Sequence, residues 1–183
     1  MQTYLRNTAL LICDLQKKTI PNLYKAKEVI NNVNKLLTIK MVSPVINFAA
    51  AAQFIPDKLG MLDRSLHINN IDMIYDKTTY SMVNNELIER LDRNDIKNII
   101  LTGMEIQWCI NNTLIDLKSL NYNIFIPVDA IGNSLNIKEN TYNLENLKTN
   151  GAKLLTTDSV IAQTLVHYND PVSKKYVKIL KEK

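Results

Sequence analysis

Three side chains of complementary chemistry, a carboxylate, an ammonium and a thiol, each stand at or just beyond the end of a short apolar run. Asp14 ends the run Ala9–Cys13, Lys77 ends a second run, and Cys109 follows a third. A cysteine attacks carbonyl carbon as its thiolate, and a neighbouring carboxylate can take the thiol proton and return it to a leaving group. The set predicts a nucleophilic site with Cys109 as nucleophile, Asp14 as acid and base, and Lys77 as their partner.

The surroundings of Cys109 are expected to activate it. The residue opens a predicted helix, where the helix dipole favours an anion, and the Lys77 ammonium adds a second positive charge. We therefore expect the pKa of the Cys109 thiol to lie below its ordinary value of about 8.5. The turn from Gly103 to Cys109 exposes backbone N–H groups that can bind a developing oxyanion.

Each of the three residues also has a purely structural interpretation. Cys109 fits a small buried hydrophobe, Asp14 a turn or cap residue, and Lys77 a surface charge. Their joint placement at three strand ends favours the functional interpretation. Cys13 alternates with Asp14 along its strand, so we expect a buried, inert thiol there.

The elements that would position these side chains follow an alternating pattern. Short apolar runs predict strands at Ala9–Cys13, Pro44–Phe48, Met73–Tyr75, Lys97–Thr102, Asn123–Val128 and Lys153–Thr156, with amphipathic helical stretches between them. This alternation predicts an α/β fold of three layers, Rossmann-like, with a six-stranded, mostly parallel sheet. Sites in such folds form at the carboxyl ends of the strands. The alanine run Ala49–Ala52 fits an ordinary helical turn, a loop or a segment altered from a natural sequence.

Length and charge narrow the function classes. The 183 residues suit one domain over 1–183, and residues 168–183 are expected to form a basic helical tail. The net charge of +4 is spread along the chain, so we expect no nucleic-acid partner. Two cysteines, no secretory leader and no apolar run long enough to span a membrane predict a cytoplasmic protein with free thiols and no membrane contact. The lysines of the predicted tail form the densest basic group of the chain: Lys174, Lys175, Lys178, Lys181 and Lys183.

Three segments resemble the isochorismatase-like cysteine hydrolases, especially the branch of isochorismatase domain-containing proteins. ALLICDLQKK carries Asp14 and Gln16; YDKTTYSMV carries Lys77, Thr78, Tyr80 and Ser81; LTGMEIQWCINNTLIDL carries Gly103, Glu105, Cys109 and Thr113. NIFIPVDAIGNS, with Asp129, and GAKLLTTDSVIAQTL resemble later parts of the family. The likeness runs from about Thr8 to Leu165.

The resemblance implies a six-stranded parallel sheet, the roles given above for the three side chains, and a homo-oligomer. It also implies a cis peptide between Met104 and Glu105, which would aim the N–H groups of Glu105 and Cys109 at one oxyanion. The further residues expected to contact a small-molecule substrate are Gln16, Phe48, Tyr80 and Trp108.

Two departures from the family bear on function. The nicotinamidases of this superfamily bind a metal through histidines after the second strand, but NFAAAAQFIPDKLG contains none. His67 and His167 are expected to be surface or packing residues, so we predict no metal and no cofactor. An acidic residue that close relatives carry in this region is also replaced by alanine.

Two hypotheses remain. The first is an amidohydrolase-type cysteine hydrolase that cleaves an amide or carbamoyl C–N bond through a covalent Cys109 intermediate, because a cysteine at this position favours acyl chemistry over the enol-ether cleavage of isochorismatase proper. The second is a catalytically degenerate relative that acts as a binding or scaffold module, which the altered region after the second strand supports.

Overall fold

The strands of the computed structural model form one parallel sheet. The structure describes residues 5–134, 137–165 and 169–181. Within these ranges the sheet has six strands in the order β3-β2-β1-β4-β5-β6, which confirms the predicted fold class. The strands are β1 (Thr8–Cys13), β2 (Ile46–Phe54), β3 (Met73–Lys77), β4 (Asn98–Gly103), β5 (Asn123–Pro127) and β6 (Lys153–Leu155).

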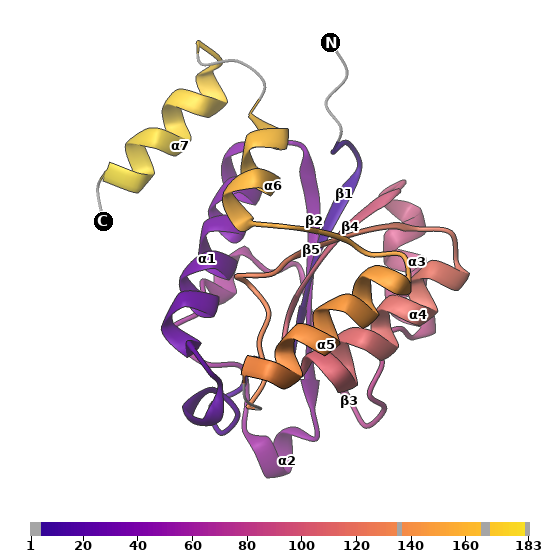
Figure 1. Ribbon diagram of the computed structural model, residues 1–183. Coiled ribbons are helices and arrows are strands. Elements are labelled where there is room, and N and C mark those ends of the chain that lie inside the picture. The colour runs from indigo at the N-terminus through magenta and orange to yellow at the C-terminus, as the bar shows by residue number, and fades with distance from the viewer. Residues whose placement is uncertain (1–4, 135–136, 166–168, 182–183) are drawn as a thin grey trace.

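Helices cover both faces of the sheet, as Figure 1 shows. On one face lie α1 (Ala26–Val42), α6 (Thr157–Thr164) and α7 (Pro171–Lys181); on the other lie α3 (Asn85–Arg93), α4 (Asn111–Ser119) and α5 (Ile137–Thr149). Shorter helical turns are η1 (Ile20–Asn22), α2 (Pro56–Leu59), η2 (Ile68–Asn70) and the π-helical turn η3 (Ile106–Ile110). No helix within the described residues is long and apolar enough to cross a membrane.

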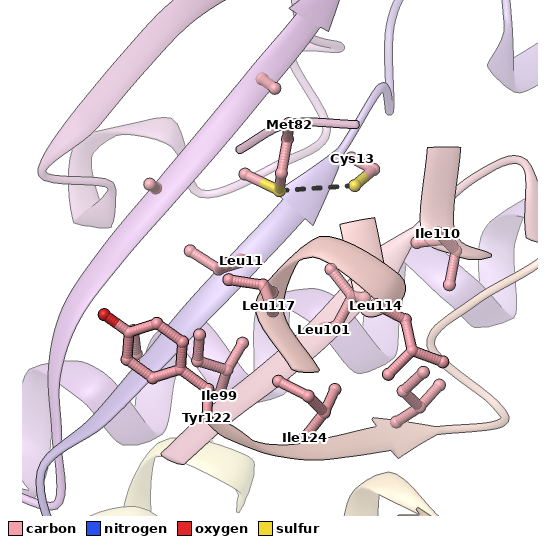
Figure 2. Packing of buried hydrophobic residues seen from close by; sticks show 14 of the residues in the cluster. Leu11, Cys13, Met82, Ile99, Leu101, Ile110, Leu114, Leu117, Tyr122 and Ile124 are labelled. Atoms are coloured by element: carbon pink, nitrogen blue, oxygen red, sulfur yellow. Dashed lines mark hydrogen bonds between the residues drawn. The ribbon is translucent and has the colours of Figure 1, made fainter. Parts of the chain in front are cut away.

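The central strand β1 is buried on both faces because both of its edges and both of its sides are covered. Leu10 and Ile12 point toward α1, whereas Leu11 and Cys13 point toward α3 and α4. Figure 2 shows the second group, with Leu11 and Cys13 near residues of α4 and β4. A continuous apolar run of this kind is typical of a strand inside a parallel sheet.

The second strand is longer than predicted, and it corrects the interpretation of the alanine run. Ala49–Ala52 are neither helix nor loop: they form the middle of β2, fully buried and paired with β1 and β3. Alanine has a weak intrinsic preference for strands, but pairing on both edges and packing on both faces override it. The carboxyl end of β2 therefore lies at Phe54 rather than at Phe48, which shifts the residues available to the site.

The C-terminal helix α7 packs on α1. Tyr176 is buried in the α1-side cluster, and Ser173 is buried as well. Lys174, Lys175 and Lys178 are exposed, so the helix has one buried and one basic face. Lys183 lies outside the described residues.

Candidate active site

The fold brings Asp14, Lys77 and Cys109 together at the carboxyl edge of the sheet. Asp14 directly follows β1, Lys77 is the last residue of β3, and Cys109 lies in η3 after β4. Lys77 Nζ is 2.9 Å from Asp14 Oδ2 and 3.4 Å from Cys109 Sγ. The strand order reverses between β1 and β4, so the group lies where ligands bind in open parallel sheets.

The Lys77 ammonium is held by several groups at once. It also donates to the carbonyl oxygens of Thr79 and Tyr80, at 3.1 Å each, and lies 4.7 Å from the centre of the Phe54 ring. Burial acts to lower the pKa of Lys77, but the negative charge of Asp14, with further contributions from the two cysteines, outweighs burial and raises it. Lys77 therefore stays protonated at neutral pH.

The environment of Cys109 corrects the expectation of a depressed thiol pKa. Burial and the charge of Asp14 raise the pKa of Cys109 to about 12, although Lys77 acts to lower it. Cys109 is the fourth residue of a π-helical turn and is 5% exposed, so desolvation of the thiolate outweighs the ammonium beside it. The surroundings of Cys109 therefore favour the neutral thiol over the thiolate.

The Asp14 carboxyl group is buried beside Lys77. Burial raises the pKa of its carboxyl group, although Lys77 acts to lower it. Asp14 Oδ2 forms an ion pair with Lys77 Nζ, and contacts with Cys109 and with the backbone N–H of Phe54 also act to lower the pKa. The backbone adopts a left-handed conformation at Asp14 (φ 54°), a region that aspartate tolerates better than most residues.

The turn from β4 to η3 is shaped by a glycine and a cis peptide. Gly103 has a φ of 108°, and a Cβ atom there would lie 2.1 Å from the carbonyl oxygen of Cys13, so only glycine fits. The peptide between Met104 and Glu105 is cis. The Glu105 carboxylate accepts hydrogen bonds from the N–H and the hydroxyl of Ser134, which ties this turn to the segment after β5.

A pocket of about 310 Å³ is lined by two of the three side chains, Asp14 and Cys109. Tyr80 and Trp108, both predicted as substrate contacts, line it and are about half exposed. Their ring centres lie 5.1 Å apart, and the Phe54 ring is 5.7 Å from Tyr80, so three aromatic rings form one wall. The complete lining is Asp14, Lys18, Thr19, Asn22, Phe54, Leu59, Tyr80, Met104, Glu105, Trp108, Cys109 and Ser134.

Two of the predicted substrate contacts, Phe48 and Gln16, are absent from the pocket lining. Phe48 is buried in the core on the α3 side, because β2 continues for six residues beyond it, and Phe54 takes the place at the pocket. Gln16 is fully buried, and its side-chain amide is occupied by the backbone of Phe54 and Gly60. Phe54, with Pro56 two residues later, was the signal in the sequence for the end of β2.

Cys13 and Asp129 lie outside this pocket. The Cys13 thiol is fully buried, 3.5 Å from the sulfur of Met82, and burial raises its pKa well above the ordinary value (Figure 2). Asp129 Oδ1 accepts from the N–H and the hydroxyl of Thr157, at 2.7 and 2.8 Å, and so anchors the start of α6.

The described residues contain no cluster of three or more histidine, cysteine, aspartate or glutamate side chains arranged to hold a metal ion. His67 is half-buried just before η2, and His167 lies outside the described residues.

Comparison with known proteins decides the family. A family model described as Isochorismatase domain matches residues 50–159, more than half of the chain. The chain belongs to the isochorismatase family. Isochorismatase family protein 2A of Dictyostelium discoideum is 30% identical over 178 residues, covering 93% of this chain and 88% of that protein.

Solved structures of other proteins share the fold over nearly the whole chain. A structure titled as the MAR1 ribonuclease of Caenorhabditis elegans has a TM-score of 0.87 at 25% identity, covering 97% of this chain and 91% of that chain. The YcaC gene product of Escherichia coli, described as an octameric hydrolase of unknown specificity, has a TM-score of 0.81 at 17% identity, covering 100% and 98%.

Proposed function

We propose that the chain is a cysteine hydrolase that cleaves an amide or carbamoyl C–N bond of a small molecule. The observation that carries the proposal is the contact of one ammonium with both the Asp14 carboxylate and the Cys109 sulfur, 2.9 and 3.4 Å away, beneath a pocket of ligand size. Family membership supports hydrolase chemistry.

In the first half-reaction the Cys109 proton passes to Asp14, and the sulfur attacks the substrate carbonyl carbon. The N–H groups of Glu105 and Cys109 would stabilise the oxyanion. Asp14 then gives its proton to the leaving nitrogen as the C–N bond breaks, which leaves a thioester on Cys109. The thiol pKa of about 12 is compatible with this order, because the thiolate forms only by transfer to a neighbouring base.

In the second half-reaction Asp14 takes a proton from water as the water oxygen attacks the thioester carbonyl. The C–S bond breaks, the acid product leaves, and the proton returns to the sulfur. Lys77 stays protonated throughout and offsets the single negative charge that moves between Asp14, Cys109 and the oxyanion. The side chains and the bound substrate thus carry one negative charge between them at every stage.

A screen of small amides and ureides, with mass-spectrometric mapping of acylated cysteine, tests the proposal. Cys109→Ala should lose at least about 10⁴-fold in turnover, because catalytic residues that act as a unit fail together. Cys13→Ala is the matched control and should keep turnover, since Cys13 lies outside the pocket. Full activity of Cys109→Ala would overturn the covalent mechanism.

A second candidate is a catalytically degenerate binding or scaffold protein, which the raised pKa of the Cys109 thiol favours. The same screen separates the two, because a binding protein would retain ligands without forming an acylated cysteine. The name of the nematode relative adds RNA as a substrate to include. We favour a small molecule, because the nucleophile is 5% exposed at the base of the pocket.

We also propose that copies of this chain associate through the aromatic face at the pocket mouth. Tyr80 and Trp108 are large, about half exposed and in contact with each other, and the Escherichia coli relative is described as octameric. Light scattering should give a mass above that of one chain, and Trp108→Arg should lower it. Val177→Arg, an exposed control on α7, should leave the mass unchanged.

A further inference from the structure

A buried glutamine joins the first two strands just below the site. The Gln16 side chain is fully buried, and both ends of its amide are occupied by backbone groups. Its oxygen accepts from the Phe54 N–H at 2.8 Å, and its nitrogen donates to the carbonyls of Phe54, at 3.2 Å, and Gly60, at 2.5 Å. A primary amide presents an acceptor beside a donor, as a peptide group does, so it extends the strand pairing beyond the end of β1.

The residue held by this amide lies directly against the ammonium of the site. Phe54 is the last residue of β2 and is paired with Lys77 in the sheet. Its ring lies 4.7 Å from Lys77 Nζ and stacks on Tyr80. The placement of the Phe54 backbone therefore sets where this ring sits over the ammonium and along the pocket wall.

Gln16 is also tied to the acid of the site. The Asp14 carbonyl accepts from the Gln16 N–H at 2.9 Å and from the Thr19 hydroxyl at 2.8 Å. We infer that Gln16 is a positioning residue: it holds Phe54 so that the ring confines the Lys77 ammonium against Asp14 and Cys109. The inference rests on the proposed function, since it assumes that the ammonium stabilises the thiolate of Cys109.

Gln53 provides a matched control from the same sheet. It is also a buried glutamine, 2% exposed, with both ends of its amide bonded. Its partners are the Leu62 N–H and the Asp76 carboxylate, both at 2.8 Å, rather than the backbone of Phe54. Loss of either amide removes buried hydrogen bonds, but only the loss of Gln16 releases the ring over the ammonium.

Alkylation of Cys109 by iodoacetamide, followed by peptide mapping, tests the inference without requiring a substrate. In Gln16→Met the alkylation rate at about pH 8 should fall at least about fivefold, because a displaced ammonium stabilises less thiolate. In Gln53→Met it should stay within about twofold of wild type, with a comparable loss of melting temperature. Gln16→Glu, which keeps the acceptor and removes the donors, replaces Gln16→Met if the latter does not fold.

A double variant shows whether Gln16 acts through the ring. Phe54→Leu removes the ring and keeps the backbone contacts of Gln16, so it should slow alkylation by itself. Gln16→Met combined with Phe54→Leu should then be no slower than Phe54→Leu alone. Additive losses, equal slowing in Gln16→Met and Gln53→Met, or wild-type alkylation in Gln16→Met would overturn the inference. A wild-type Cys109 that reacts no faster than the buried Cys13 would instead count against the proposed function.

Discussion

Replacing Lys77 with methionine tests the electrostatic core of the proposed mechanism. Methionine keeps most of the apolar length of the side chain and removes the ammonium. The variant leaves the Asp14 carboxylate buried without its partner, so the folded state is expected to lose about 3–5 kcal/mol. Lys77→Gln, which keeps hydrogen-bond donors for the carbonyls of Thr79 and Tyr80, serves if the methionine variant does not fold.

The expected loss of reactivity follows from one distance. Lys77 Nζ lies 3.4 Å from Cys109 Sγ. Two unit charges at this separation interact by about 5 kcal/mol at an effective dielectric constant of about 20, which corresponds to a factor of at least about 10³ in the thiolate population. Asp14 opposes the thiolate more strongly than Lys77 supports it, so the comparison is made at a pH where Asp14 remains ionised in the variant. We therefore expect Cys109 alkylation to slow by at least about 30-fold.

The assay follows alkylation of Cys109 between about pH 7 and 10. In the wild type the rate should rise with pH across this window without reaching a plateau, because the thiol pKa of about 12 lies above it. Lys18→Met is the matched control, because this lysine also lines the pocket. Its Nζ donates to the Lys58 carbonyl at 2.8 Å rather than to Asp14 or Cys109, so the alkylation rate should not change. Equal rates in Lys77→Met and the wild type would refute the stabilising role of the ammonium.

Three further predictions concern neighbouring residues. Asp14→Asn should lower the pKa of the Cys109 thiol and speed its alkylation, because the Asp14 charge raises that pKa. Turnover should fall at least about 100-fold, because the site loses its acid and base. Slower alkylation would contradict the predicted direction of the pKa change. Gly103→Ala should lower the free energy of unfolding in urea by more than about 3 kcal/mol, and Gly151→Ala, also at positive φ but facing a flexible side chain, by about 1 kcal/mol. Asp129→Ala should lower the free energy of unfolding by about 1–2 kcal/mol, because the start of α6 loses its hydrogen bonds to this carboxylate. The alkylation rate of Cys109 should stay unchanged, and a slower rate would contradict the prediction.

Strand ends were predictable wherever local sequence and tertiary environment agree. The run before Asp14 is apolar at every position and buried on both faces, so its length and its end could be read directly. Strand β4 is also buried throughout, whereas β3 alternates between buried and exposed positions and ends two residues beyond its predicted end at Tyr75. The convergence of the three side chains then follows from parallel strand order, because carboxyl ends meet at one edge.

The site wall was not predictable, because it depends on where β2 ends. Ala49–Ala52 have no strong preference for strand, and only pairing with β1 and β3 makes them one. The predicted end of β2 lay six residues too early, so Phe48 was predicted at the pocket where Phe54 lies. For the same reason the role of Gln16 was misread: its backbone partners are visible only once Phe54 and Gly60 are placed beside it.

The amino-acid sequence by itself determined the order of strands and helices and which chemical groups stand at the strand ends, because both follow from the local spacing of apolar and polar residues. Only the tertiary structure decided the protonation state of Cys109. Its thiol pKa depends on the balance between burial, the carboxylate of Asp14 and the ammonium of Lys77, which come from distant parts of the chain. Desolvation is a property of everything packed around an atom, and no local pattern records it.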